Sequence, residues 1–510
     1  MPRQWIGILI ACAVLCQAHA AVAGEAGEVG VPAGASIAEL QRAMASGRLS
    51  AEALTRRSLE RIEALDRHGP SLHAVLRVNP QALAQARQLD SERRAHHVRG
   101  ALHGIPVLIK DNIETADPIP TTAGSRALLH NYARQDAPVV AALRAAGAVI
   151  LGKTNLSEWA NFRSTHAMSG WSAVGGLTRN PYVLDRTACG SSSGSAVAVA
   201  AGLVPAALGT ETDGSVTCPA AMNGIVGLKP TIGLLSQQGI VPIAHSQDTA
   251  GPMAHSVRDV AQLLSALTGR DYTRAIASDA LRGKRLGVLR FKPGAYPATD
   301  LVYGQALDTL RAAGATLVDV SSPDMDTISA AEQIVMLHEF KTDIDAYLAH
   351  TPAAVHTRDL AALIAYDYAS PSELRFFGQE LFTQAQASDG TAGADYRAAL
   401  ERARRLAGAQ GIDRLLHQQA LDALIAPTAT PAWRVDILYG DPNEDAFTTL
   451  AAVAGYPHLT VPMGQVQGLP VGLSFIGAAH AEALLLALGG AYEMRRGRLP
   501  PPRFMASLEK

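Results

Sequence analysis

The sequence predicts an α/β fold, organised as one large domain behind a short N-terminal leader. Short apolar runs bounded by Gly, Pro or Asn alternate with segments of helical periodicity, as expected when strands and helices alternate. Residues 104–155 contain "GIPVLIKDN", "DAPVVAALRAAG" and "AVILGKTN", a strand–helix–strand unit of the kind that pairs its strands in parallel. The chain has 510 residues, 48% of them hydrophobic. This length also fits two or three ordinary domains, but no repeat or low-complexity linker marks a boundary.

The first 23 residues have the features of a secretory signal. Arg3 provides a positive start, residues 5–15 form a short apolar core, and "AHA" at 18–20 or "AVA" at 21–23 offers a cleavage site. We therefore expect cleavage near residue 20 or 23, a mature chain of 24–510, and a periplasmic or secreted location without a stable membrane anchor. An uncleaved anchor is the alternative, but the apolar run is too short to span a bilayer. Leu15 argues against lipidation of Cys16.

Three helices are expected after the leader. The stretch "SIAE" at 36–39 has the form of a capping box, and "NPQALAQARQLDSERR" has a Pro near the start of a helical pattern. Between them, a helix from Ser50 would place these residues on one face: Ala51, Leu54, Ser58, Ile62 and Leu65.

Beyond residue 280, further buried strands alternate with a long helical stretch. The helical stretch, about 325–418, includes "TISAAEQIVMLHEF" and "DYRAALERARRLAGAQG", and we expect it to cap the site and shape substrate choice. The expected strands are short apolar runs ended by turn residues: "RLGVLRF" (285–291), "GATLVDV" (314–320), "LDALIAPT" (421–428), "HLTVPMG" (458–464) and "LPVGLSFIG" (469–477).

Charge and cysteine content narrow the functional classes. Lys and Arg number 44 against 46 Asp and Glu, a formal net charge of −2, so nothing indicates a nucleic-acid partner or a polybasic membrane surface. Removal of the leader would leave Cys189 and Cys218. An oxidising compartment allows them to pair, but a chain of this size does not need a disulfide, so free buried thiols are favoured.

Ser215 in "GTETDGSVTCPA" (209–220) is a candidate nucleophile, although no histidine lies within twenty residues of it. A helix of about ten residues starting at Ser191 is roughly 15 Å long, and the strand "LVPAALG" that returns from it covers roughly 20 Å. The start of the helix and the end of the strand therefore lie at one level, which can bring Ser191 to Ser215. Lys110 ends another strand, and ligands of open α/β sheets gather beyond the carboxyl ends of strands.

These residues fit a serine–lysine scheme, which needs a neutral lysine. The ordinary lysine pKa is about 10.4, and burial lowers it. Thr212, Asp213, Gly214 and Ser215 form a turn whose backbone N–H groups can hold an oxyanion. Taken singly, however, a strand-end lysine usually reaches solvent and a serine-rich turn usually caps a helix. We interpret the G-x-S-x-G match around Ser192 as accidental, because no apolar strand precedes it.

At these residues the chain resembles the amidase signature enzymes, and among them the bacterial peptide amidases. The similarity covers essentially the whole mature chain and implies a large mixed β-sheet covered by helices. Its most specific part is the Gly/Ser segment with its serine spacing. The matching stretches include "LHGIPVLIKDNI", "GAVILGKTNLSEWANF", "GWSAVGGLTRNPY", "CGSSSGSAVAVAAGLVPAALGTETDGSVTCPAAMNGIVGLKPT" and "QDTAGPMAHSVRD".

The resemblance implies a Ser–Ser–Lys triad. Lys110 matches its lysine, Ser191 its middle serine, which takes a cis peptide, and Ser215 its nucleophile, with oxyanion donors on the backbone of 212–215. The implied reaction is hydrolysis of the C-terminal amide of a peptide, through an acyl-enzyme and without metal or cofactor. Most members carry "GGS" and then an arginine two positions after the nucleophile. Here "DGS" and Thr217 stand instead, departures that the peptide amidases share.

Trp159 and Phe162 in "SEWANF" are candidates for lining the acyl-side pocket, with packing in the core as the alternative.

Three other functions compete with a peptide amidase. The nearest is a broader amidase acting on aryl or aliphatic amides. The A subunit of a tRNA-dependent amidotransferase is opposed by the leader, since tRNA charging is cytosolic. An exported binding protein with this fold is opposed by the presence of Lys110, Ser191 and Ser215 together. A small amide substrate is the expected partner, and the oligomeric state stays open.

Overall fold

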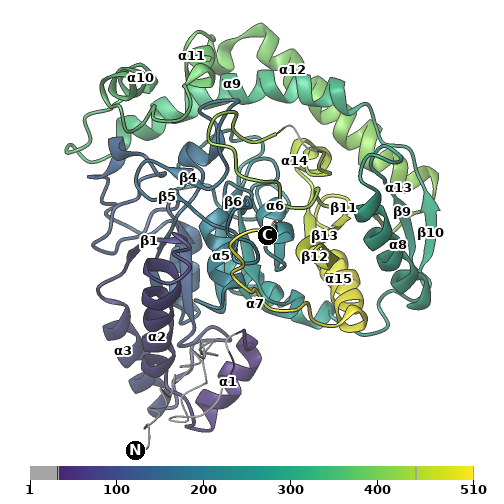
Figure 1. Ribbon diagram of the computed structural model, residues 1–510, viewed down its shortest axis with the longest axis horizontal. Coiled ribbons are helices and arrows are strands. Elements are labelled where there is room, and N and C mark those ends of the chain that lie inside the picture. The colour runs from purple at the N-terminus through teal and green to yellow at the C-terminus, as the bar shows by residue number, and fades with distance from the viewer. Residues whose placement is uncertain (1–31, 33, 443–444, 509–510) are drawn as a thin grey trace, which may run out of the picture.

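The computed structural model describes residues 32, 34–442 and 445–508 (Figure 1). The predicted leader, residues 1–23, and its cleavage sites lie outside these described residues. Among the helices that are described, none combines the length and the apolar character needed to cross a membrane.

A mixed sheet of eleven strands forms the centre of the molecule (Figure 1), which confirms the predicted α/β class. The strand order is β1-β3-β2-β6-β8-β7-β12-β13-β11-β9-β10, and β4 and β5 form a separate two-stranded sheet. The strands are β1 Val75–Val78, β2 Pro106–Lys110, β3 Val149–Thr154, β4 Trp171–Ser172, β5 Gly176–Leu177, β6 Ala206–Glu211, β7 Val226–Lys229, β8 Thr249–Ala254, β9 Arg285–Val288, β10 Thr316–Asp319, β11 Ala423–Pro427, β12 His458–Val466 and β13 Leu469–Ile476.

The middle of this sheet is antiparallel, from β6 through β8, β7, β12 and β13 to β11, and parallel pairs lie on each side of it. Strand β2 pairs in parallel with β3 and with β6, which confirms the predicted strand–helix–strand unit. Strands β7 and β8 were not predicted, because the Gly and Pro residues in "VGLK" and "TAGPMA" obscure a strand pattern. Pro252 sits in the middle of β8, where β7 pairs only with Met253 and Ala254, so the missing N–H costs no ladder bond on that side.

Helices cover the sheet, and the first of them begin where the sequence predicts. Ser36 and Glu39 form the capping box of α1, and Ser50 caps α2 through the N–H of Ala53. The α-helices outside the segment 325–418 are α1 Ile37–Ala45, α2 Ala51–Arg61, α3 Ala82–Arg94, α4 Pro138–Ala145, α5 Ser193–Ala200, α6 Thr217–Met222, α7 Val257–Thr268, α8 Pro297–Ala312, α14 Thr449–Ala454 and α15 Glu482–Arg496.

The predicted helical segment 325–418 forms an arch over one end of the sheet (Figure 1). Its two longest helices, α9 and α12, pack against each other, and α9 also contacts α10, α11 and α14. The helices of this arch are α9 Met325–His350, α10 Leu360–Ala369, α11 Glu380–Gln386, the 3-10 helix Gly390–Ala392, α12 Ala394–Arg404, the π-helix Arg405–Asp413 and α13 Arg414–Gln418.

Helix α5 is buried on all sides, and its composition follows from that position. It contains only Ser, Gly, Ala and Val, and all eight residues are buried. It packs on β2, β3, β6 and β8. A Cβ atom on Gly194 would lie 2.3 Å from the carbonyl oxygen of Ala74 and 2.6 Å from that of Asn155, so only glycine fits this contact. Close packing in the core therefore requires the small residues of this Gly/Ser-rich segment.

Candidate active site

Lys110 is the last residue of β2, and its amine is buried at the carboxyl end of this inner strand. Nζ lies 2.7 Å from Ser191 Oγ, 2.8 Å from Thr210 Oγ1 and 3.3 Å from the Thr210 carbonyl oxygen. Burial lowers the pKa of Lys110 to about 7, against the opposing effect of the Asp248 and Glu211 carboxylates. A substantial fraction of this amine is therefore neutral near pH 7 and able to accept a proton.

Ser191 lies between the sheet and α5, next to the segment that carries Ser215. Helix α5 starts two residues later than predicted, and the Gly190–Ser191 peptide is cis, as the resemblance implied. The N–H of Ser192 donates to the carbonyl oxygen of Ser215 at 3.1 Å, which brings the two serine segments together. The Ser192 hydroxyl is bonded to the backbone of Thr210 at 3.0 and 3.2 Å, a structural role that agrees with its dismissal as a nucleophile.

Thr212–Ser215, called the oxyanion turn below, connects β6 to α6. Gly214 has φ 75°, a left-handed conformation that glycine adopts without a steric penalty. None of the four backbone N–H groups donates to another described residue. The next two N–H groups, of Val216 and Thr217, both donate to Glu211 Oε2, at 2.7 and 2.8 Å. The turn therefore presents free donors of the kind that stabilise an oxyanion.

Side chains on each side of the oxyanion turn fix its position. Thr212 Oγ1 donates to Asp248 Oδ1 at 2.6 Å, and Thr449 Oγ1 donates to Asp213 Oδ2 at 2.6 Å. Burial raises the pKa of Asp213, and it raises the pKa of Asp248 to about 7. Thr217 donates its hydroxyl to Glu211 Oε2 at 3.1 Å, so the residue that replaces the usual arginine is part of this bonded frame.

Comparison with known proteins identifies the family of this chain. A family model described as amidase matches residues 53–486. The chain belongs to the amidase signature family. The native peptide amidase from Stenotrophomonas maltophilia shares 50% sequence identity with it and superposes with a TM-score of 0.88, over 92% of this chain and 98% of that one. An amidase family protein from Bacillus anthracis is 35% identical and superposes with a TM-score of 0.84, over 92% of each chain. A probable amidase of Arabidopsis thaliana is 38% identical over 92% of each chain.

The amidase contains two further buried lysines, which clarify why Lys110 is the candidate base. Lys153 lies 3.5 Å from Asp111 Oδ1 and donates to the Thr121 hydroxyl at 2.7 Å. Lys229 ends β7, and burial lowers its pKa to about 8. Of the three, Lys110 is the lysine whose amine contacts a serine hydroxyl of the Gly/Ser segment.

Several residues of this site were missed by sequence reasoning. Thr210 holds the Lys110 amine, Glu211 takes two N–H groups after the oxyanion turn, and Asp248 holds Thr212. Thr210 and Glu211 stand directly before the turn in "GTETDGS", so the end of β6 was a usable signal. Asp248 lies 36 positions from Thr212, and no local pattern links the two.

Cys189 and Cys218 form a disulfide, with Cα atoms 6.0 Å apart. The sequence favoured free thiols, and the structure corrects this. Cys189 precedes Ser191 by two positions and Cys218 follows Ser215 by three, so the contact that brings the serines together also brings the cysteines together. The disulfide thus links the two segments that carry the candidate serines.

Replacing both cysteines by alanine is expected to lower the free energy of unfolding by about 3–4 kcal/mol, because the disulfide closes a loop of 29 positions in the unfolded chain. Urea unfolding of the double variant and the native protein, both without reductant, measures this difference. With reductant present, the two unfolding curves should approach each other. Equal unfolding free energies without reductant would show that the bridge does not form.

Trp159 and Phe162 lie in an aromatic cluster beneath the arch rather than on the exposed surface. Trp159 packs edge-on against Phe382 with centroids 6.0 Å apart, and Phe162 packs against Phe340 at 5.1 Å. Trp159 has φ 50°, a strained value for a bulky residue. These contacts explain how the arch is attached to the core, and a role for either ring in substrate binding stays a prediction.

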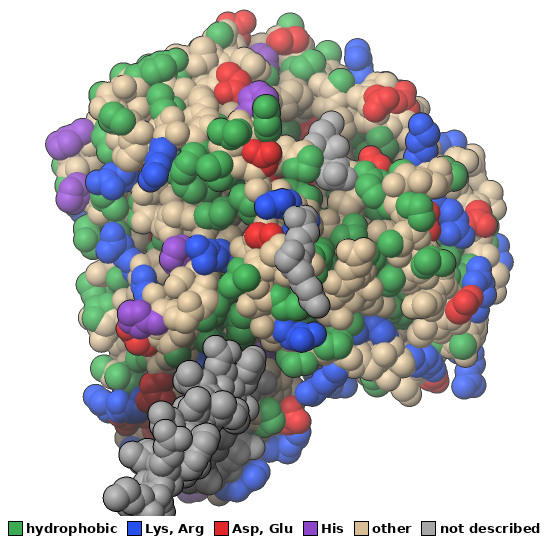
Figure 2. All heavy atoms as spheres, viewed as in Figure 1, with side chains coloured by type: hydrophobic (Ala, Val, Ile, Leu, Met, Phe, Trp, Pro, Cys, Tyr) green, Lys and Arg blue, Asp and Glu red, His purple; other side chains and the backbone are tan. Residues whose placement is uncertain are grey.

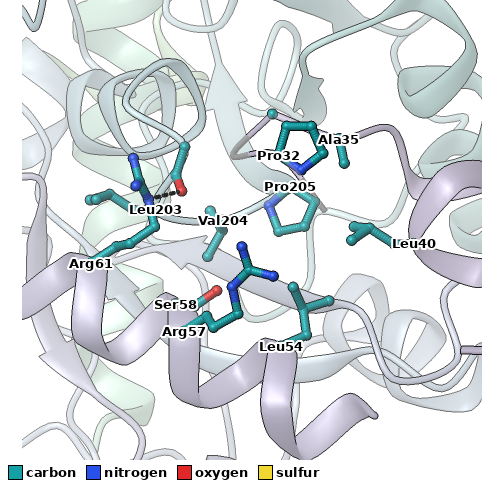
Figure 3. Close-up of a pocket in the computed structure, with 12 residues that line it drawn as sticks. Pro32, Ala35, Leu40, Leu54, Arg57, Ser58, Arg61, Leu203, Val204 and Pro205 are labelled. Carbon is teal, nitrogen blue, oxygen red and sulfur yellow. Dashed lines mark hydrogen bonds between the residues drawn. The ribbon is translucent and has the colours of Figure 1, made fainter. Parts of the chain in front are cut away.

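The hollow shown in Figure 3 is separate from this site. It has a volume of about 210 Å³ and lies beside the loop that follows the C-terminal end of α5, whereas the candidate serines lie near the N-terminal end, about 12 Å away along the helix. Arg61 lines one side of it and donates to the carbonyl oxygens of Ala201 and Gly202, at 2.7 Å each. This arginine joins α2 to the core, and we assign the hollow no part in the chemistry.

Proposed function

We propose that this amidase hydrolyses the C-terminal carboxamide of peptides to the free acid and ammonia, with Ser215 as nucleophile. The observation that carries the proposal is the buried Lys110 amine 2.7 Å from Ser191 Oγ, beside a segment bonded to the carbonyl of Ser215. The 50% identity to a peptide amidase supports the substrate class, as do the "DGS" turn and Thr217. Acidic and basic side chains are interspersed on the face in Figure 2, which carries no large patch of one charge.

The proposed mechanism uses two serines and one lysine. Ser215 Oγ attacks the amide carbonyl while its proton passes to Ser191, whose own proton passes to neutral Lys110. The developing oxyanion is held by N–H groups of the oxyanion turn. The lysinium, again through Ser191, then protonates the leaving nitrogen, which departs as ammonia. Water attacks the acyl-enzyme by the reverse relay and regenerates Ser215.

Turnover should rise with pH through about 7, because only the neutral Lys110 amine accepts a proton and burial lowers its pKa to about 7. Below that value the neutral fraction falls about tenfold for each pH unit, so kcat/KM should fall with the same slope. A pH–rate profile in a constant-ionic-strength buffer measures this limb. A profile that is flat between pH 5 and pH 8 would contradict the assignment of Lys110 as the base.

The substrate proposal is tested by ammonia release from a matched panel. Each peptide is supplied as the C-terminal amide, as the free acid and as the N-methylamide, alongside aryl and fatty primary amides. We expect ammonia from the peptide amides, and no cleavage of internal peptide bonds. Faster turnover of the aryl or fatty amides would instead identify a broader amidase, while leaving the serine chemistry in place.

We also propose that the amidase is exported, on the basis of the predicted leader in residues 1–23. The disulfide between Cys189 and Cys218 supports this, because such bonds persist in oxidising compartments. Expression of the full chain in a bacterium, followed by fractionation and N-terminal sequencing, should find a mature protein that starts near residue 21 or 24. An intact N-terminus in the cytoplasmic fraction would contradict export.

A further inference from the structure

The loop 243–248 joins the helical arch to the oxyanion turn. Asp248 Oδ1 accepts a hydrogen bond from Thr212 Oγ1 at 2.6 Å. Its other oxygen, Oδ2, accepts from the backbone N–H groups of Ile243 and Ala244 at 2.8 and 3.1 Å. Asp248 thus closes its own loop with one oxygen and holds the oxyanion turn with the other, so a shift of the loop would be passed to the turn.

The opposite side of this loop is bonded to two carboxylates of α9. His245 Nδ1 lies 2.9 Å from Asp343 Oδ2, and His245 Nε2 lies 3.4 Å from Glu339 Oε1. The backbone N–H groups of His245 and Ser246 donate to the same two acids at 3.0 and 2.9 Å. A neutral imidazole protonated at Nδ1 donates to Asp343, whereas the doubly protonated ring also forms an ion pair with Glu339, 3.4 Å from Nε2.

The titratable groups around His245 come from three elements. Helix α9 contributes Glu339 and Asp343, the loop itself contributes Asp248, and α12 places the Tyr396 hydroxyl 2.8 Å from Glu339 Oε1. The hydrogen bond to Asp343 raises the pKa of His245, with further increases from the charges of Glu339, Asp343 and Asp248 and an opposing effect of partial burial. Because 48% of the side chain is exposed, the ring exchanges protons readily with solvent.

We propose that His245 is a positioning residue for the amidase reaction, whose imidazolium clamps the loop 243–248 to α9 and so holds the oxyanion turn in place. The proposal rests on the proposed function, since it assumes that the turn serves Ser215. The clamp also fixes Asp248, whose charge raises the pKa of Lys110 against the effect of burial. His245 touches none of the reacting groups and acts through Asp248 and Thr212.

The clamp should depend on pH in the sense opposite to the Lys110 limb. Because the pKa of His245 is raised above its ordinary 6.5, the clamp is complete below that value and is lost as the pH rises through the raised one. Turnover should therefore rise through about pH 7 as Lys110 becomes neutral, and then fall at higher pH as the imidazolium loses its proton.

Two substitutions at His245 separate charge from mere packing. His245→Asn keeps a donor near Asp343 but no positive charge, and we expect kcat to fall about tenfold at pH 7.5, less than on deleting an oxyanion donor, with KM within about twofold. Its profile should lack the alkaline fall, since its turn is already loosened. His245→Arg keeps the charge and can bond carboxylates with two N–H groups, so it should retain native kcat and keep it at pH 9.

The matched control is His68→Asn, which removes a surface histidine that lies 2.8 Å from Glu63 on a distant helix end and should change neither kcat nor the pH profile. Thermal unfolding of each variant shows that it is folded. The rate at which a serine-directed phosphonate labels Ser215 is measured beside ammonia release, because labelling does not depend on the choice of amide. If the wild type is not labelled at Ser215, the proposed function fails.

Three results would overturn the clamp while leaving the proposed function intact. One is a His245→Asn protein whose kcat and labelling rate equal the wild type's. Another is a His245→Arg protein that still loses activity at pH 9. The third is loss of wild-type activity on EDTA treatment that zinc restores, because His245, Glu339 and Asp343 have ligand atoms within 4.8 Å of one another and would then hold a metal ion instead of sharing a proton.

Discussion

Replacing Ser215 by alanine is expected to lower kcat by at least about 10⁴-fold, because the other hydroxyl on the oxyanion turn, that of Thr212, is bonded to Asp248. Residual hydrolysis would come from the oxyanion donors alone. The Ser215 hydroxyl makes no hydrogen bond to another described residue, so its removal should leave stability nearly unchanged. Steady-state ammonia release measures the loss of kcat, and urea unfolding checks the fold.

Covalent labelling identifies the nucleophile directly. A serine-directed phosphonate should add one label to the wild type, and peptide mapping should locate it on Ser215. The label should be absent from Ser215→Ala and retained in Ser195→Ala, a serine of the same segment whose hydroxyl lies 2.8 Å from Thr154 Oγ1. Labelling of the Ser215→Ala protein at native rate would assign the nucleophile elsewhere.

Replacing Lys110 by methionine is expected to lower kcat by about 10²- to 10⁴-fold, the usual contribution of a general base. Methionine has a similar shape and no amine, so the acid limb near pH 7 should disappear from the residual activity. The protein should stay folded, because the buried amine of Lys110 has no carboxylate within ion-pair distance among the described residues and is costly to desolvate. Stopped assays of ammonia release across pH 5–9 measure both effects.

Lys153→Met is the matched control for this change. Lys153 is equally buried but is paired with Asp111, so its removal leaves a buried carboxylate without its cation. We expect this variant to lose about 3–5 kcal/mol of unfolding free energy, in contrast to Lys110→Met. Native activity in Lys110→Met, or equal destabilisation of the two variants, would contradict the role given to Lys110.

Much of this fold could be predicted because its elements carry local signals. The parallel pair β2 and β3 appears as apolar runs bounded by turn residues, and the capping box of α1 is visible in "SIAE". The meeting of Lys110 with Ser191 followed from a general rule. Lys110 ends strand β2, and Ser191 stands just before a helix that starts beside the carboxyl ends of the strands. The Ser215 segment reached the same edge because helix and strand cover similar lengths.

The remainder depended on contacts that the chain makes only when folded. Strands β7 and β8 were missed because their Gly and Pro residues are tolerated by particular neighbours in the sheet. The disulfide depended on two loops meeting, and Asp248 reaches Thr212 across 36 positions. The attachment of His245 to α9 spans almost a hundred positions and uses a buried and a half-buried acid together, which no local pattern encodes.

The burial of α5 has a consequence for how relatives of this chain are recognised. Its small residues are required by the close approach of Ala74 and Asn155 to Gly194, and that requirement persists whether or not the neighbouring serines react. A descendant that lost Ser215 or Lys110 would keep the helix and would still be assigned to the family. The Gly/Ser signature therefore reports the scaffold, and the candidate catalytic side chains at the carboxyl ends of the strands have to be checked one by one.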